Sequence, residues 1–296
     1  MKIEEIAEET YRIQVSDQKV NSRFAIYFIR EGKGVLIEPG PASMNPYIQE
    51  ALGQLGMTDP GFIIPTHIHI DHGGAIGSLA ELFPEAKVFV HPRGAKHALD
   101  PTRLIASTKM AFGDDYEDRY GPLVPVPESQ LIVPEDGEVF SINGRDLQIF
   151  YAPGHAPHHI AILDRKTGGL FSGESLGVPR PGTESSPMPT AAPPAFDIED
   201  YLETIEKLRK LHPRRLFYSH DGTGENPEAL IPEVARNTKN IGDIILNTLK
   251  EGKSIEVVDT RLREYLSARI GREADDMGDN MTTRGFIHYF EKKGLV

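Results

Sequence analysis

The stretch Pro65-Thr66-His67-Ile68-His69-Ile70-Asp71-His72-Gly73-Gly74 places three histidines and one aspartate within six positions. It follows a short apolar run typical of a buried strand, and it leads into a predicted helix. Alternate residues of an extended stretch share a face, so we expect His67, His69 and Asp71 to point the same way. The turn into the helix then brings His72 round, and the isoleucines between the ligands face the core.

This cluster predicts a metal site. Crowded imidazoles and a carboxylate would repel protons and lose solvation unless something neutralised them. Four potential ligands so close in sequence suit two adjacent divalent cations, and imidazole with carboxylate favours Zn²⁺, Fe or Mn. The 296 residues include no cysteine, which excludes disulfides, cysteine nucleophiles, iron–sulfur clusters and thiolate zinc sites. Any metal must therefore be held by histidines and carboxylates.

Further potential ligands occur where later predicted strands end. His155 stands in the segment Ala152–His159 between two strands, and His220 follows the strand that starts at Arg215. Glu174 comes just after another strand. Ligands on loops at one end of a sheet can converge on a single site.

Strands and helices alternate along the first 225 residues, which predicts a sheet with helices on its outer faces. We expect strands at 11–15, 24–29, 34–37, 62–64, 87–90, 139–142, 147–151, 160–163, 170–171 and 215–219. We expect helices at 43–55, 73–82, 92–99 and 197–211, and then, from about residue 226, only helices, at 228–249, 255–267 and 282–293.

The order of these residues resembles the metallo-β-lactamase-fold hydrolases, whose signature is HxHxDH, a later histidine, an acid and a last histidine. The resemblance covers about residues 10–222, and its ligand pattern is similar to that of glyoxalase II. It implies an α+β fold, a four-layer αββα sandwich with a dinuclear metal site at one edge and a C-terminal helical extension. Residues 1–225 would form the catalytic domain, and 226–296 a helical cap or dimerisation segment.

The resemblance also implies a ligand set. One metal would be held by His67, His69 and His155, and the other by Asp71, His72 and His220. The family's bridging acid corresponds to Glu174, where most members have Asp. Its extra methylene leaves two alternatives, since either the metals lie differently or Glu174 binds only one of them. The segment Leu36–Gly40 looks like the family's strand-end acid–glycine motif, again with Glu for Asp.

Two cations that share a water would lower its pKa toward neutrality and would polarise the scissile carbonyl or phosphoryl oxygen. Asp71 is then the catalytic residue, because it can orient the hydroxide and accept its proton. We predict a dinuclear metal-dependent hydrolase of a small ester, thioester, lactone or phosphodiester, with two divalent ions, Zn²⁺ before Fe or Mn. The alternatives are a non-hydrolytic di-iron protein that reduces or senses O₂ or NO, and a nuclease.

The charge balance bears on the partners. With 44 acidic and 32 basic residues the net charge is −12, which disfavours nucleic acid, and the near-neutral segment 226–296 lacks a basic stripe. We therefore expect a small-molecule substrate. The apolar runs are far shorter than the roughly 20 residues of a spanning helix, and the acidic N-terminus has no signal-peptide pattern. We expect no membrane partner and a cytoplasmic location.

Substrate specificity is expected in two less regular segments, 101–130 and 177–195, of which the first resembles a partly helical insertion. The second is rich in Pro, Gly, Ser and Thr, which indicates a lid or binding loop or else a plain solvent loop. The candidate substrate-binding residues are His158, Arg180 and Tyr116. A packed, satisfied histidine is the alternative for the first, and a surface position is the alternative for the other two. Neither segment carries a motif that chooses among the substrates.

Overall fold

The computed structural model describes residues 1–17, 22–179, 186–220, 222–270 and 281–296. The chain divides into two compact units. The first comprises 1–151, 158–173 and 214–223, and the second comprises 152–157, 174–213 and 224–296. The boundary predicted between residues 225 and 226 stays a prediction.

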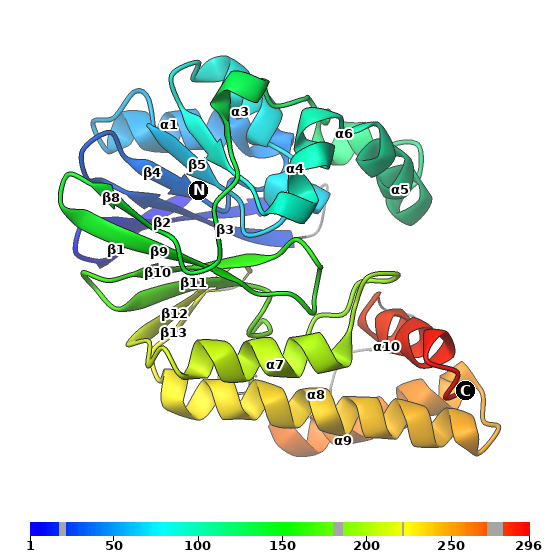
Figure 1. Ribbon diagram of the computed structural model, residues 1–296. Helices are drawn as coiled ribbons and strands as arrows, with labels where there is room; N and C mark the ends of the chain where they lie inside the picture. The colour runs from blue at the N-terminus through cyan, green and yellow to red at the C-terminus, as the bar shows by residue number, and fades with distance from the viewer. Residues whose placement is uncertain (18–21, 180–185, 221, 271–280) are drawn as a thin grey trace. The chain divides into compact units, whose positions relative to one another are not determined.

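The first unit contains a seven-stranded sheet in the order β1 to β7 (Figure 1). Its strands are β1 (Lys2–Ala7), β2 (Thr10–Asp17), β3 (Ser22–Ile29), β4 (Val35–Ile37), β5 (Phe62–Ile64), β6 (Lys87–Phe89) and β7 (Leu131–Ile132). Strands β1 to β4 pair antiparallel, whereas β4 to β7 pair in parallel. Because β4 and β5 run in parallel side by side, the residues that follow each of them emerge at the same edge of the sheet.

A second sheet has the order β13-β12-β11-β10-β9-β8. Its strands are β8 (Val139–Ile142), β9 (Arg145–Tyr151), β10 (Ile160–Asp164), β11 (Gly169–Gly173), β12 (Arg215–Tyr218) and β13 (Thr223–Gly224). Strands β11 and β12 pair in parallel, whereas β10 pairs antiparallel with both β11 and β9.

Strand β3 shows how the first sheet is buried on both faces. Phe24, Ile26 and Phe28 belong to the core on one face, which includes side chains from the helices α1 (Asn45–Gln54) and α3 (Ile76–Leu82). The alternate residues, Tyr27 among them, belong to a second core shared with the other sheet. The period-two pattern of the strand thus builds two apolar layers at once. The first unit has helices on one sheet, and the two sheets face each other.

The other helices that the structure describes in the first unit are α2 (Ile70–Gly73), α4 (Pro92–Leu99), α5 (Thr102–Phe112) and α6 (Tyr116–Tyr120). Short 3-10 turns lie at Ala42–Met44 and Glu128–Gln130. The segment 101–130, expected to be less regular and partly helical, contains α5 and α6.

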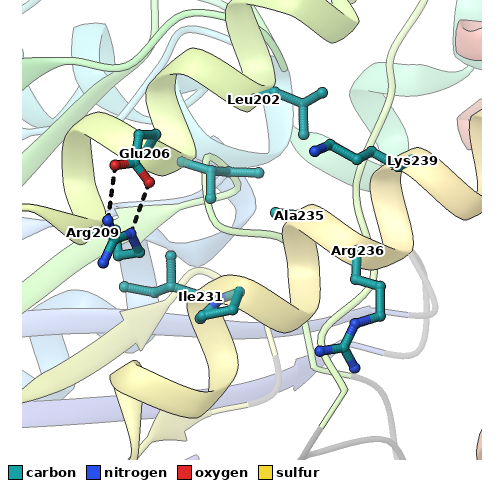
Figure 2. Close-up of a pocket in the computed structure, with 9 residues that line it drawn as sticks. Leu202, Glu206, Arg209, Ile231, Ala235, Arg236 and Lys239 are labelled. Atoms are coloured by element: carbon teal, nitrogen blue, oxygen red, sulfur yellow. Dashed lines mark hydrogen bonds and ion pairs between the residues drawn. The ribbon is translucent and has the colours of Figure 1, made fainter.

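The second unit contains α7 (Ile198–Arg209), α8 (Pro227–Lys250), α9 (Ile255–Ile270) and α10 (Met281–Lys292). Its first helix begins where the Asp197 side chain accepts hydrogen bonds from two backbone N–H groups of the first turn. A groove of about 600 Å³ lies between α7 and α8 (Figure 2), and its lining includes Leu202, Ile231 and the cations Arg236 and Lys239. The predicted metal ligands are not among its lining residues.

The predicted strands and helices are confirmed to within a few residues, with one correction at the motif itself. We expected the helix to begin at Gly73 and Asp71 to lie in an extended stretch. This is wrong, because α2 begins at Ile70 and is separate from α3. The backbone N–H groups of His72 and Gly73 both donate to the His69 carbonyl, at 3.0 and 2.8 Å. The early turn, not strand alternation, therefore sets the direction of Asp71.

Within the described ranges, no helix is long and apolar enough to cross a bilayer.

His91 predicts a pH dependence of stability. Its buried Nδ1 accepts a hydrogen bond from the Arg93 N–H at 3.0 Å at the start of α4, which requires the neutral ring. Burial, helped by the charge of Arg93, lowers the pKa of His91 to about 4. The unfolded chain therefore binds this proton first, so the group's stabilising contribution is complete above about pH 6.5 and is lost as the pH falls toward 4.

We expect the free energy of unfolding, measured with urea in the presence of a chelator, to fall by about 2 kcal/mol between pH 7 and pH 5 because of this residue. His91→Asn keeps a capping acceptor and removes the titration, so its loss over that range should be smaller by that amount. Equal pH dependence in both proteins would contradict the assignment.

Candidate metal centre

Glu38 is the buried residue that joins the two ends of the histidine motif. It follows β4, and its Oε1 accepts a hydrogen bond from the Thr66 N–H at 2.6 Å. Its Oε2 lies 2.7 Å from Nδ1 of His72. Glu38 has a φ of +56°, a left-handed conformation that costs of order 1 kcal/mol in a residue other than glycine. The two hydrogen bonds of its side chain help to hold Glu38 in this strained conformation.

The backbone reinforces this junction. Gly40, with a φ of +75°, donates its N–H to the His72 carbonyl at 3.0 Å and accepts from the Ala75 N–H at 2.9 Å. Glycine is also required at position 73, because a Cβ there would lie 2.8 Å from the His67 carbonyl oxygen. The absence of a side chain at Gly73 therefore permits the close backbone approach at this helix start.

Asp71, His72 and His220 form one group of potential metal ligands within the first unit. Nδ1 of His72 faces the Glu38 carboxylate, and Nδ1 of His220 lies 3.1 Å from the Arg23 carbonyl oxygen. Both partners are acceptors, so each Nδ1 carries the hydrogen and each neutral ring presents its Nε2 lone pair.

The two Nε2 atoms lie 3.4 and 3.8 Å from the same Asp71 oxygen. Two lone pairs and a carboxylate oxygen that face one another repel unless a cation or a proton lies among them. Two imidazoles and a carboxylate are a donor set that suits Zn²⁺ and similar divalent transition metals. These residues therefore fit one metal ion, and the partly exposed Asp71 remains open to solvent.

His67 and His69 form a pair in the same unit. Nε2 of His67 lies 2.9 Å from Nδ1 of His69, and the other nitrogen of His67 is hydrogen-bonded to the Thr66 hydroxyl at 3.1 Å. The isoleucines at 68 and 70 are buried as expected, so the loop between the ligands is anchored in apolar cores.

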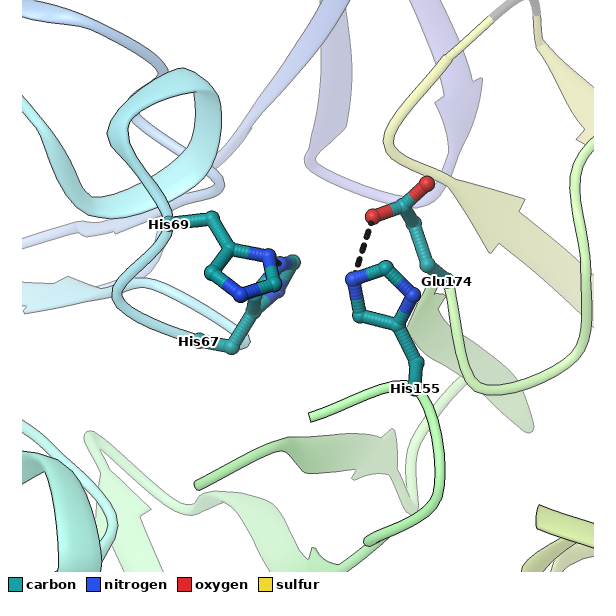
Figure 3. Close-up of side chains that lie close together, drawn as sticks. All are labelled: His67, His69, His155 and Glu174. Carbon is teal, nitrogen blue, oxygen red and sulfur yellow. Dashed lines mark hydrogen bonds and ion pairs between the residues drawn. The ribbon is translucent and has the colours of Figure 1, made fainter. Parts of the chain in front are cut away.

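His155 and Glu174 form a pair in the second unit, with His155 Nε2 at 2.9 Å from Glu174 Oε2. Nδ1 of His155 donates to the Thr190 carbonyl at 3.1 Å, which again leaves Nε2 as the potential ligand atom. Figure 3 draws both pairs and marks the interaction within the second. The two pairs belong to different units.

Of the candidate substrate-binding residues, the structure describes His158 and Tyr116. His158 is half-buried, and its Nδ1 accepts from the Ile68 N–H at 3.5 Å while its ring stacks on His67 at 6.1 Å. Its role in substrate binding stays a prediction. Arg180 lies outside the described residues.

Tyr116 is fully buried, in an apolar cluster with Ile70 of the motif. The surface position considered for it is therefore wrong. Burial and the hydrogen bond to Glu117 raise the pKa of Tyr116 to about 12, so its hydroxyl stays protonated.

Comparison with known proteins tests the family resemblance. The family described as "Metallo-beta-lactamase superfamily" matches residues 23–220, which confirms the resemblance drawn from the HxHxDH signature. A metallo-beta-lactamase fold-containing protein of Sulfurisphaera tokodaii is 30% identical over 164 residues, 54% of this chain and 60% of the relative. An atrochrysone carboxyl ACP thioesterase of Aspergillus fumigatus is 25% identical over 224 residues, 73% of this chain and 58% of the relative. The chain thus spans about 60% of the length of these curated relatives.

A solved structure supports the fold over nearly the whole chain. The metallo-beta-lactamase family protein from Thermus thermophilus covers 98% of this chain and 95% of its own, with a TM-score of 0.73 and 19% identity. The predicted α+β metallo-β-lactamase fold with C-terminal helices is therefore confirmed.

Glu38→Gln should weaken the binding of one metal ion and spare the other. The glutamine amide can still accept from Thr66, but its NH₂ group would face Nδ1 of His72. His72 then moves its hydrogen to Nε2 and loses the ligand lone pair. We expect one of two zinc equivalents to bind about 10–100-fold more weakly in competition with a chromophoric chelator.

The exposed Glu50 of α1 offers a matched control, since Glu50→Gln makes the same chemical change on the surface. If Glu38→Gln binds both equivalents as tightly as the Glu50→Gln protein does, Glu38 does not set the His72 tautomer.

Proposed function

Because this chain belongs to the metallo-β-lactamase superfamily, we propose that it is a dinuclear metal-dependent hydrolase that cleaves a small thioester. One observation carries the proposal, namely the two Nε2 lone pairs of His72 and His220 that face the Asp71 carboxylate. Each of these rings is fixed by a hydrogen bond on its far side, so the group is organised for a cation before one binds.

The proposed second metal site combines the pairs from the two units. His67, His69 and His155 would supply three imidazoles, the set that the family order assigns to one metal. The His155–Glu174 contact at 2.9 Å supports the inclusion of Glu174 as a further ligand. Glu174 would either bridge both ions or bind only one of them. We propose Zn²⁺ as the ion, with Fe and Mn as alternatives.

When bound, two such cations acidify a water molecule and polarise the scissile carbonyl oxygen. The protein's own contribution lies in Asp71 and in the hydrogen bonds behind the ligands. Asp71 is the group that would orient the attacking water and accept its proton, because its carboxylate is partly exposed beside His72. The Glu38 and Arg23 contacts hold the imidazoles in place, which lowers the reorganisation that the reaction needs.

A thioester is proposed first because the Aspergillus relative, at 25% identity, is named a thioesterase. The net charge of −12 supports a small substrate over a long polyanion. A simple ester, a lactone and a phosphodiester are the other outcomes of a substrate panel. For 226–296 the two alternatives are a helical cap and a segment that forms a homodimer.

The test combines elemental analysis with substrate hydrolysis. We expect two bound divalent ions per chain and turnover of short S-acyl thioesters that is lost on chelation. Asp71→Asn should lower kcat/KM by at least about 100-fold, as removal of a general base does. Asp59→Asn, on the exposed surface, is the matched control and should keep full activity.

Activity that survives in Asp71→Asn would overturn the assigned role. Iron in place of zinc, an absorption spectrum that changes with O₂, and no hydrolysis of any substrate would favour the di-iron alternative.

A further inference from the structure

The C-terminal helices of the second unit contact the loop that carries Thr190, the residue behind His155. We propose that Asn237 of α8 is a positioning residue for the His155–Glu174 pair and acts through the backbone of residues 186–190. The proposal rests on the proposed function, because it takes the pair as metal ligands. The residues that link Asn237 to the pair all belong to the second unit.

The amide of Asn237 is buried and makes hydrogen bonds through both of its ends. Its Nδ2 donates to the Ser186 hydroxyl oxygen at 3.0 Å and to the Pro187 carbonyl at 2.9 Å. Its Oδ1 accepts from the Tyr265 hydroxyl of α9 at 2.7 Å. One side chain thus ties two C-terminal helices to the backbone of the loop.

Ser186 is held from a second direction. Its hydroxyl donates to Glu233 of α8 at 2.9 Å, and Glu233 also forms an ion pair with Arg269. These groups are buried or nearly so, and a buried polar network fixes a single arrangement when each member has its partners. The start of the described loop is therefore anchored to α8 and α9.

From this anchor the backbone leads directly to the ligands. Met188 and Val178 exchange two backbone hydrogen bonds, at 2.9 and 3.0 Å, which fixes the loop against the segment after Glu174. Two residues later, the Thr190 carbonyl accepts from His155 Nδ1 at 3.1 Å. The Thr190 hydroxyl donates to the Glu174 carbonyl at 3.3 Å.

The Thr190 carbonyl sets the tautomer of the His155 ring. A carbonyl can only accept, so it places the hydrogen of His155 on Nδ1 and leaves Nε2 as the lone pair. Partners behind a ligating histidine commonly change metal affinity 10–100-fold when they are altered. A shift of the 186–190 backbone would move this acceptor, and the His155 ring would no longer be held in one orientation.

Helix α10 also contacts residues 191–196, which continue the loop. A Cβ at Gly285 would collide with the Ala191 carbonyl, so α10 approaches the loop as closely as glycine allows. The rings of Phe286 and Phe196 lie 4.8 Å apart between centroids. Three C-terminal helices thus contact the segment 186–196, and the expected packing role of this region includes the support of a ligand loop.

The experiment measures zinc affinity and the cobalt spectrum of the full chain. In Asn237→Ala we expect one of two Zn²⁺ equivalents to bind about 10–100-fold more weakly, by competition with a chromophoric chelator. The visible absorption of one Co²⁺ equivalent should change, and the other equivalent should match wild type.

Thr238→Val is the matched control. It removes a buried hydrogen bond from the next position of α8, where the hydroxyl donates to the Val234 carbonyl. It should lower thermal stability without changing either zinc equivalent or the cobalt spectrum. If Asn237→Ala does not fold, Tyr265→Phe tests the same chain of contacts, because it removes the donor that orients the Asn237 amide. For that variant we also expect one of the two Zn²⁺ equivalents to bind more weakly.

Unchanged zinc affinity in a folded Asn237→Ala or in Tyr265→Phe would overturn the inference. Equal weakening in Thr238→Val would overturn it too, since the effect would then be one of general stability. Fewer than two zinc equivalents in the wild-type protein would instead contradict the proposed function. The two failures are therefore distinguishable.

Discussion

The Glu38 carboxylate is the constraint on which the candidate metal centre of the first unit depends. It accepts one hydrogen bond from the backbone after β5 and another from His72 on α2, so a single buried group fixes both the entry and the exit of the motif. The parallel pairing of β4 and β5 brings these partners to the same edge. Fold and chemistry are linked here, because the residue that closes the loop also decides which nitrogen of His72 carries the hydrogen.

Three other histidines also have a hydrogen-bond partner at Nδ1. His220 and His155 each direct Nδ1 to a backbone carbonyl, of Arg23 and of Thr190, and His67 directs Nδ1 to a neighbouring hydroxyl. Backbone carbonyls cannot donate, so they set a tautomer without adding a competing charge. A chain without cysteine thereby presents potential ligand atoms of defined direction from imidazoles and carboxylates alone.

Much of this architecture follows from local patterns in the sequence. Apolar alternation and turn residues indicate the strands and helices, and the spacing of His67, His69, Asp71 and His72 indicates a metal site because a bound cation neutralises the cluster. The start of α2 cannot be predicted in this way, because it depends on how closely Gly73 approaches the His67 carbonyl, which is a tertiary contact.

Other features leave no local signal at all. The Thr190 contact uses a backbone carbonyl, which every residue has, so no side-chain pattern marks it. Asn237 is one polar residue on a long amphipathic helix, and its importance lies in partners about 50 positions earlier in the chain. The place of Glu38 after a strand is visible in the sequence, yet its bond to His72 depends on the pairing of β4 with β5.

The most direct test of the proposed metal centre is anomalous diffraction at the zinc absorption edge from crystals of the zinc-loaded protein. We predict two peaks per chain, one of them at roughly 2.0–2.2 Å from Nε2 of His72, Nε2 of His220 and an oxygen of Asp71. A map with no peak at these three atoms, or with zinc bound only elsewhere on the surface, would contradict the proposal.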